Sequence, residues 1–118
     1  MKIVNRGDVC MVNFNTRNRE GNVQVGYRPA VIVQNNVGNK FSPTTIVVPM
    51  TSRFRKNNLP THVFCPRGEG GVQSDSLILA EQIMIIDKDQ ISRVIGSLPE
   101  RILGSVDCAM KISLGLCS

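Results

Sequence analysis

The side chains able to do chemistry in this chain are few and widely spaced. The single histidine is His62, and the cysteines at positions 10, 65, 108 and 117 are separated by 55, 43 and 9 positions. No pair has the short spacing that zinc sites use, and no P-loop, G-x-G-x-x-G turn or G-x-S-x-G elbow occurs. The sequence therefore predicts no metal and no cofactor. The even cysteine count allows a disulfide scaffold, but a chain of this length does not need one, so we expect reduced thiols in the cytosol.

The remaining polar combinations have plain structural interpretations. Asp87 and Asp89 flank Lys88 in a predicted turn, where solvated or capping charges are a simpler interpretation than an acid–base pair. The G-E-G-G stretch at 68–71 lacks the helix and the lysine of a phosphate cradle and indicates a turn. His62 lies in a predicted strand with no nucleophile nearby in sequence, which favours a structural or solvent-facing role.

One class of reaction needs few special groups. RNA carries its own nucleophile, the ribose 2′-hydroxyl beside the scissile phosphate. A protein has to align this hydroxyl, accept its proton and stabilise the charge added to the phosphoryl group, and arginine and hydroxyl side chains can do the last of these. A basic chain that is poor in histidine is compatible with such metal-free chemistry, although compatibility alone does not establish it.

Basic charge is concentrated in the first half of the chain. Residues 1–67 carry ten Lys or Arg and two acidic residues, a net charge of +8, whereas residues 68–118 carry a net charge of −3. Nine of the 14 cations are arginine, which can bind a phosphate through two N–H groups. This distribution is typical of a protein that binds a polyanion, usually nucleic acid, but a solubility surface or a site for an acidic protein fits the charge equally well.

The length of 118 residues and the hydrophobic content of 42% predict one domain, 1–118, with a packed core. Aromatic residues make up only 4%, so nucleic-acid binding would depend on charge and hydrogen bonds more than on stacking. No apolar run approaches the roughly 18–20 residues of a membrane span, and the N-terminus has no secretory pattern. We therefore expect no association with a membrane.

Short strands and one terminal helix are expected to position the polar groups. The expected strands are 8–14, 30–34, 44–50, 61–65, 76–80, 82–86 and 93–96, separated by polar turns and loops at 15–26, 35–43 and 51–59. Arg28 and Pro29 are expected at the entrance of the second strand, because proline cannot donate to a central ladder. The pattern is typical of a small, strongly curved β-barrel with a helix packed on it.

The helix is predicted from about Pro99 to Leu114. Ser97 and Glu100 fit a capping box, with proline in the first turn. An apolar stripe at three- and four-residue spacing follows, made of Ile102, Leu103, Val106, Met110 and Leu114. Gly104 weakens the helix by roughly 1 kcal/mol relative to alanine, and we expect it to mark a close packing contact.

An ordered set of stretches carries a family resemblance. They are R-G-D-V at 6–9, R-P-A-V-I-V-Q-N at 28–35, S-P-T-T-I-V-V-P-M-T at 42–51, L-P-T-H-V at 59–63, D-S-L-I-L-A-E-Q-I at 75–83 and K-I-S-L-G-L at 111–116. Over almost the whole chain they resemble the MazF/PemK-type toxins, which are sequence-specific endoribonucleases of bacterial type II toxin–antitoxin pairs.

The resemblance implies a mainly β fold with a C-terminal helix, the SH3-like small barrel of the MazF/PemK/CcdB type. It also implies a cytoplasmic homodimer that binds single-stranded RNA, including mRNA, and a cognate acidic antitoxin. The implied reaction needs no metal and leaves a 2′,3′-cyclic phosphate and a 5′-hydroxyl.

The family's catalytic residues correspond to Arg28 and Thr51. Without the resemblance, a surface ion pair would be the simpler interpretation of Arg28, and a turn or helix-capping residue that of Thr51. Further RNA-binding positions implied by the family are Arg6, Arg17, Arg19, Ser52, Arg53, Leu59, Pro60, Glu81 and Gln82.

Several of these further positions have structural alternatives. Arg6 could instead pair with Asp8 at a strand end. Glu81 and Gln82, which the resemblance assigns to reading a base, could be a polar break between two strands. Leu59 and Pro60 could shape their loop and pack on no base. Arg17 and Arg19 belong to the loop that the resemblance places at the rim of the RNA groove.

Two other functions are compatible with the sequence. Toxins of the CcdB type share the fold, poison DNA gyrase and are not enzymes, but they act through a C-terminal ending that this chain does not match. A non-catalytic module that binds nucleic acid or an antitoxin is allowed by composition alone.

Overall fold

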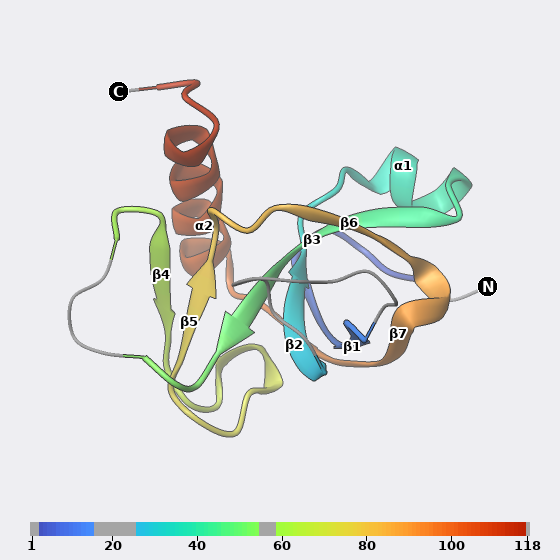
Figure 1. Cartoon of the computed structure of the whole chain (residues 1–118), viewed down its shortest axis with the longest axis horizontal. Coiled ribbons are helices and arrows are strands. Elements are labelled where there is room, and N and C mark those ends of the chain that lie inside the picture. Colours follow the sequence, from blue (N-terminus) through green and yellow to red (C-terminus); the bar gives the residue numbers. More distant parts are fainter. Residues whose placement is uncertain (1–2, 16–25, 55–58, 118) are drawn as a thin grey trace.

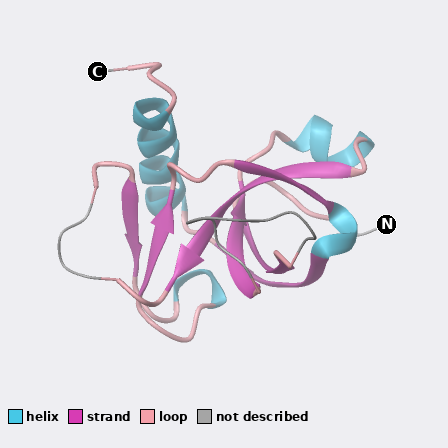
Figure 2. Cartoon of the chain, viewed as in Figure 1, coloured by secondary structure: helices cyan, strands magenta, loops and turns pink. Residues whose placement is uncertain are grey.

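The apolar runs form one antiparallel sheet (Figures 1 and 2). The computed structural model describes residues 3–15, 26–54 and 59–117. Its strands are β1 (Asp8–Asn13), β2 (Tyr27–Ile32), β3 (Thr44–Thr51), β4 (His62–Cys65), β5 (Ser76–Leu79), β6 (Met84–Asp87) and β7 (Ile91–Ser97). The helices are α1 (Asn36–Phe41), α2 (Glu100–Ser113) and the short 3-10 turns η1 (Glu69–Gly71) and η2 (Lys88–Gln90).

Strand β3 is the centre of the sheet. The strand order is β4-β5-β3-β2-β1-β7, and β6 pairs with the first half of β3, on the same edge where β5 pairs with its last two residues. The sheet curls strongly, as Figure 1 shows, but the ladder stays open because β6 and β7 are not paired within the described residues. The mainly β fold with a C-terminal helix is thus confirmed, as an open barrel.

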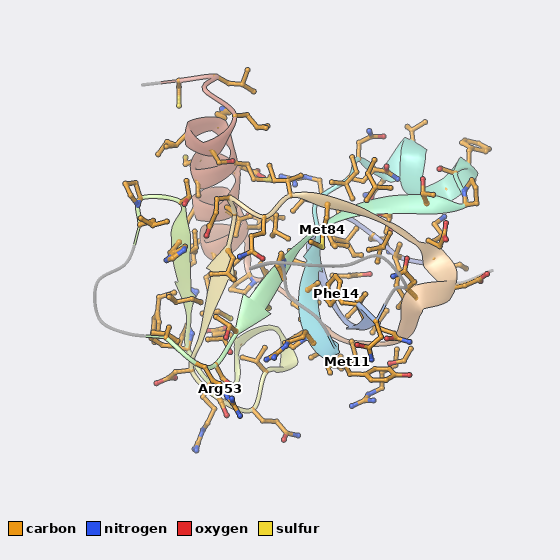
Figure 3. The ribbon with its side chains drawn as sticks, in the orientation of Figure 1. Met11, Phe14, Arg53 and Met84 are labelled. Atoms are coloured by element: carbon orange, nitrogen blue, oxygen red, sulfur yellow. The ribbon has the colours of Figure 1, made fainter. Side chains whose placement is uncertain are left out.

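Side chains along each strand point alternately to the two faces of the sheet, and they form a core on each face. Val31, Val48 and Met50 face the core that α2 closes with Ile102 and Val106. Their neighbours in sequence face the other core, inside the curl, which contains Val12, Phe14, Ala30, Ile32, Val47 and Ile86. Figure 3 shows Phe14, which is fully buried, inside this curl.

Two local expectations are wrong at element ends. The expected loop 35–43 contains the short helix α1, whose start is capped because the Asn35 side chain accepts a hydrogen bond from the Gly38 N–H at 2.8 Å. Strand β2 begins at Tyr27, so Arg28 and Pro29 lie within it, and its pairing with β3 begins directly after the proline, at Ala30.

The start of the terminal helix also differs from the prediction. Helix α2 begins at Glu100 with Pro99 at the N-cap position and no side-chain cap. Ser97 ends β7 instead, and its hydroxyl bonds to the Asp8 carboxylate at 2.9 Å. The capping box therefore does not form, because the serine is bound by a neighbouring strand. Leu114 follows the helix and is 59% exposed.

The close backbone approach lies at Gly71 and Gly96, and the expected one at Gly104 is wrong. A Cβ atom at Gly104 would meet nothing within 4 Å. A Cβ atom at Gly71 would lie 2.1 Å from the Ile95 carbonyl oxygen, and one at Gly96 would lie 2.5 Å from the Gly70 carbonyl oxygen. The missing side chains let the turn around η1 rest directly on β7.

No helix in the described part of the chain is long and apolar enough to cross a membrane.

Candidate active site

Strand register places Arg28 and Thr51 opposite each other. Strands β2 and β3 pair Ala30 with Pro49 and Val31 with Val48, and the same register continued by two residues sets Arg28 across from Thr51. Directly opposed residues of an antiparallel pair project from the same face, with neighbouring backbones about 4.8 Å apart. The two predicted catalytic residues, 23 positions apart in sequence, are thereby brought together at one end of the sheet.

A cavity of about 360 Å³ is lined by Arg28 and by Met50 and Ser52, the two neighbours of Thr51 in sequence. Its basic and polar lining comes from Arg28, Ser52, Gln73, Ser74, Ser76 and Arg93. Its apolar lining includes Met11, Pro29 and Met50. No acidic residue of the described chain lines it, so the cavity suits an anion such as a phosphate.

The Thr51 hydroxyl is held by the turn that follows β3. Thr51 Oγ1 accepts a hydrogen bond from the Arg53 N–H at 3.1 Å and donates to the Arg53 carbonyl at 3.2 Å. Arg53 and Ser52 are exposed just beyond the strand. Figure 3 shows Arg53 and Met11 at the same end of the molecule, where β3 finishes. Ser52 and Arg53 thus lie beside the first pair, as the sequence predicted.

The other predicted base-contacting residues form a second group. Thr51 pairs with Leu77 at the start of β5, whereas Glu81 and Gln82 follow the other end of that strand. Leu59 and Pro60 are exposed beside them, where β4 begins (Figure 1). The structure therefore separates the catalytic pair from this group by the length of β5.

Hydrogen bonds fix the carboxylate of Glu81. Its Oε1 accepts from the Thr61 hydroxyl at 3.2 Å, and its Oε2 lies 3.0 Å from His62 Nε2. His62 Nδ1 accepts from the Leu59 N–H at 3.3 Å, so Nε2 carries the proton that bonds to Glu81. His62 is therefore a positioning residue, as its structural interpretation suggested. The buried Gln82 Oε1 has no hydrogen-bond partner within the described structure.

Arg6 is held by partners that belong to neither group. Its guanidinium forms an ion pair with Asp107 of α2 and also reaches the Val33 carbonyl at 3.4 Å. The alternative partner, Asp8, instead accepts hydrogen bonds from the Asn5 N–H and the Ser97 hydroxyl. Arg17 and Arg19 lie outside the described residues.

Arg93 and Gln73 are candidate site residues that the sequence analysis missed. Arg93 belongs to an expected strand, so its presence beside Arg28 depends on the pairing of β7 with β1. Gln73 belongs to the turn that packs on β7 at Gly71, and it lines the cavity. Neither residue lies in a motif that would have pointed to it. The excess of arginine over lysine indicated only that some arginines bind phosphate.

The family follows from comparison with known proteins. The model of the PemK-like, MazF-like toxins of type II toxin–antitoxin systems matches residues 5–114. The chain belongs to this family.

Curated relatives of this MazF-like toxin are enzymes by name. Endoribonuclease EndoA of Bacillus subtilis is 42% identical over 114 residues, which cover 97% of each protein. Endoribonuclease MazF of Staphylococcus saprophyticus is 40% identical over 114 residues, which cover 97% of this chain and 93% of that protein. The predicted class, a MazF-type toxin endoribonuclease of a toxin–antitoxin system, is confirmed.

Solved structures support the fold of the MazF-like toxin. MazF from Deinococcus radiodurans matches with a TM-score of 0.81 at 22% identity, covering 98% of this chain and 99% of that one. A mycobacterial endoribonuclease solved with its cognate antitoxin matches with a TM-score of 0.77 at 21% identity, covering 100% of this chain and 99% of that one.

The four cysteines of the MazF-like toxin differ in exposure. Cys10 and Cys65 are free and buried, whereas Cys108 and Cys117 are free and exposed. Burial, helped by the nearby Asp8 carboxylate, raises the pKa of Cys10 to about 12. Burial and then Glu69 raise the pKa of Cys65, which Arg101 partly offsets. Thiols held protonated in this way are poor nucleophiles.

Metal-binding groups do not gather in the described part of the MazF-like toxin. Across residues 3–15, 26–54 and 59–117, no three His, Cys, Asp or Glu side chains are placed to hold one ion. The site chemistry that these residues offer is that of arginine, hydroxyl and amide groups.

Proposed function

We propose that this MazF-like toxin cleaves single-stranded RNA, including mRNA, at specific sequences without a metal ion. The observation that carries the proposal is the β2–β3 register, which sets Arg28 across from Thr51. Arg28 also lines a cavity that no acidic side chain of the described residues lines. In this reaction the ribose 2′-oxygen attacks the adjacent phosphorus and the bond to the 5′-oxygen breaks. The products are a 2′,3′-cyclic phosphate and a 5′-hydroxyl.

Arg28 and Thr51 act on the charge that the reaction creates. The 2′-hydroxyl loses a proton and the leaving 5′-oxygen gains one, while negative charge grows on the phosphoryl oxygens. The guanidinium of Arg28 stabilises this charge and the leaving oxygen, and Thr51 Oγ1 adds a hydrogen bond by turning from the Arg53 carbonyl to the phosphate. In this scheme solvent water accepts the 2′-proton and supplies the proton that the 5′-oxygen takes up.

The second group reads the RNA sequence. Leu59 and Pro60 are exposed apolar surfaces on which a base can pack. Glu81 presents an oriented carboxylate, which can accept hydrogen bonds from the edge of a base. An RNA strand that runs along β5 would pass from this group to the catalytic pair, a path of about 13 Å for the four residue steps from Leu77 to Glu81.

The proposed assembly is a homodimer that uses the face formed by β4 and α2. A groove of about 710 Å³ lies there, lined by small residues of the helix, Gly104, Ser105, Cys108 and Ala109. Phe64 on β4 and Ile112 on α2 flank it and are 50% and 43% exposed. Strand β4 is also an edge of the sheet. A second copy would cover these apolar side chains, which a small domain leaves exposed.

The proposed protein partner is a cognate acidic antitoxin, in the cytoplasm. The net charge of +8 in residues 1–67 attracts an acidic segment to the same surface as RNA. An antitoxin bound there excludes the substrate by competition for the arginines.

The test compares Arg28→Ala and Thr51→Ala with the unchanged toxin on a long RNA in EDTA. Removing one transition-state donor typically lowers the rate on the order of 10²–10³-fold. We expect such losses with unchanged circular dichroism, because both side chains are at least partly exposed. Lys40→Ala, which removes an exposed cation on α1, is the matched control and should keep full activity.

A 2′-deoxy nucleotide on the 5′ side of the cut should abolish cleavage and spare most binding, because it removes the nucleophile. Full activity of Arg28→Ala, cutting of the deoxy strand, or a strict need for a divalent ion would each contradict the mechanism. Binding without cleavage by the unchanged chain would favour a non-catalytic module, and gyrase inhibition alone would favour a CcdB-like poison.

A further inference from the structure

A row of side chains crosses four strands on the floor of the cavity beside Arg28. Met11 of β1 pairs with Arg93 of β7 on one side and with Pro29 of β2 on the other. Continuing the β2–β3 register sets Met50 across from Pro29. Opposed residues share a face of the sheet, and all four of these line the cavity. The row is therefore an apolar floor with a guanidinium at its outer end.

The rim above this floor is polar and exposed. Gln73 and Ser74 come from the turn that Gly71 and Gly96 hold against β7. The Gln73 amide can donate and accept at once, which is the pattern that reads the edge of a base. Thioether and proline surfaces are suited to the flat face of a base, and the volume of about 360 Å³ falls at the small end of ligand cavities, roughly 300–1,000 Å³.

Arg93 is available to a ligand. It is exposed, and among the described residues it forms no ion pair. Its strand lies two strand spacings, about 10 Å, from β2, which carries Arg28. Arg28 and Arg93 both line the cavity, and two arginines can hold the two phosphates that flank one nucleotide.

We propose that this cavity binds one nucleotide of the RNA, its base on Met11 and Pro29 and read by Gln73, with Arg93 on the phosphate beyond it. The inference rests on the proposed RNA cleavage and adds a specificity site to it. Arg93 is a phosphate-binding residue at this site, and Gln73 is a specificity-determining residue.

The test uses Arg93→Gln, with Lys40→Gln as the control that removes an equal charge outside the cavity. The first measurement is binding of a deoxy-substituted, uncleavable strand across a range of salt concentrations. We expect Arg93→Gln to weaken binding about 10-fold or more and to lower the slope of log affinity against log salt by about 0.7. Lys40→Gln should change neither quantity appreciably, and circular dichroism should show both variants folded.

The second measurement is the sequence of the 5′ ends left when Gln73→Ala cuts a long RNA. We expect its preference to relax about 10-fold or more at one position of the recognised sequence. The inference is overturned if Arg93→Gln matches Lys40→Gln in affinity and salt slope and Gln73→Ala keeps the original cut sites. If the unchanged toxin binds but cuts no RNA, the proposed function fails, and the Arg93 comparison on the uncleavable strand still decides the nucleotide site.

Discussion

At the scale of single residues, environment decides which groups can react. Arg93 lines a cavity without acidic side chains from the described ranges and can take a phosphate, whereas Arg6 is already paired with Asp107. Glu81 is bound at both carboxylate oxygens by Thr61 and His62, so it can present a fixed acceptor geometry. The same residue type thus serves structure or function according to its partners.

The buried thiols predict that stability falls in alkaline solution. Because the pKa of Cys10 is about 12 in the folded chain against an ordinary 9.0, the folded state keeps its proton between these values while the unfolded state loses one. The free energy of unfolding therefore decreases as pH rises from about 9 towards 12, and Cys65 acts in the same direction.

Urea unfolding of the unchanged chain and of Cys10→Ala, at pH 8 and pH 10, measures this effect. The variant should be less stable at pH 8, because it leaves a cavity, and should lose less stability on going to pH 10. An equal loss in both proteins would refute the assignment to Cys10.

At the scale of elements, the turn around η1 depends on glycine. Gly68 and Gly71 both have positive φ, +93° and +84°, but only at Gly71 would a Cβ atom strike backbone, at 2.1 Å from the Ile95 oxygen. We expect Gly68→Ala to lower stability by about 1 kcal/mol, and Gly71→Ala by about 3 kcal/mol or more. Thermal melting of both variants measures this difference in stability.

Gly71 also lines the cavity, so Gly71→Ala should weaken RNA binding as well, and Gly68→Ala should not. Equal melting temperatures for the two variants would show that the close approach of the turn to β7 is not needed.

Sequence patterns predicted elements well where the signal was local. The apolar runs gave the strands and the stripe around Val106 gave α2, because burial dictates those periods. Ser97 was misassigned because its hydroxyl bonds to Asp8, a partner distant in sequence. Arg93 was missed for the same reason, since only the β1–β7 pairing brings it beside Arg28. The proposed catalytic pair itself came from the family resemblance, and register explains why those two positions meet.

At the scale of the whole molecule, the apolar face on β4 and α2 adjoins the site. Phe64 packs edge to face on Phe54, with ring centroids 6.4 Å apart, and Phe54 lies three residues after Thr51. The ring contact thereby connects this face with the residues that follow Thr51.

We expect Phe64→Glu to convert the dimer into a monomer near 13.0 kDa, because a charge would be buried at the interface. Light scattering at micromolar concentration measures the mass. Phe41→Glu, at a phenylalanine that is 73% exposed on α1, is the matched control and should remain a dimer. A monomeric unchanged chain, or dimers for both variants, would remove β4 and α2 from the interface.

The uneven burial of the thiols also means that labelling of the unmodified chain can report on its assembly. Cys108 lies in the groove between β4 and α2, Cys117 lies beyond the helix, and the two remaining thiols are buried and held protonated. A maleimide dye offered to the native protein has only two accessible targets, and a second copy seated in the groove shields one of them. After a short pulse of dye, the ratio of labelling at Cys108 to that at Cys117 therefore reports how much of the protein was associated, without any engineered tag.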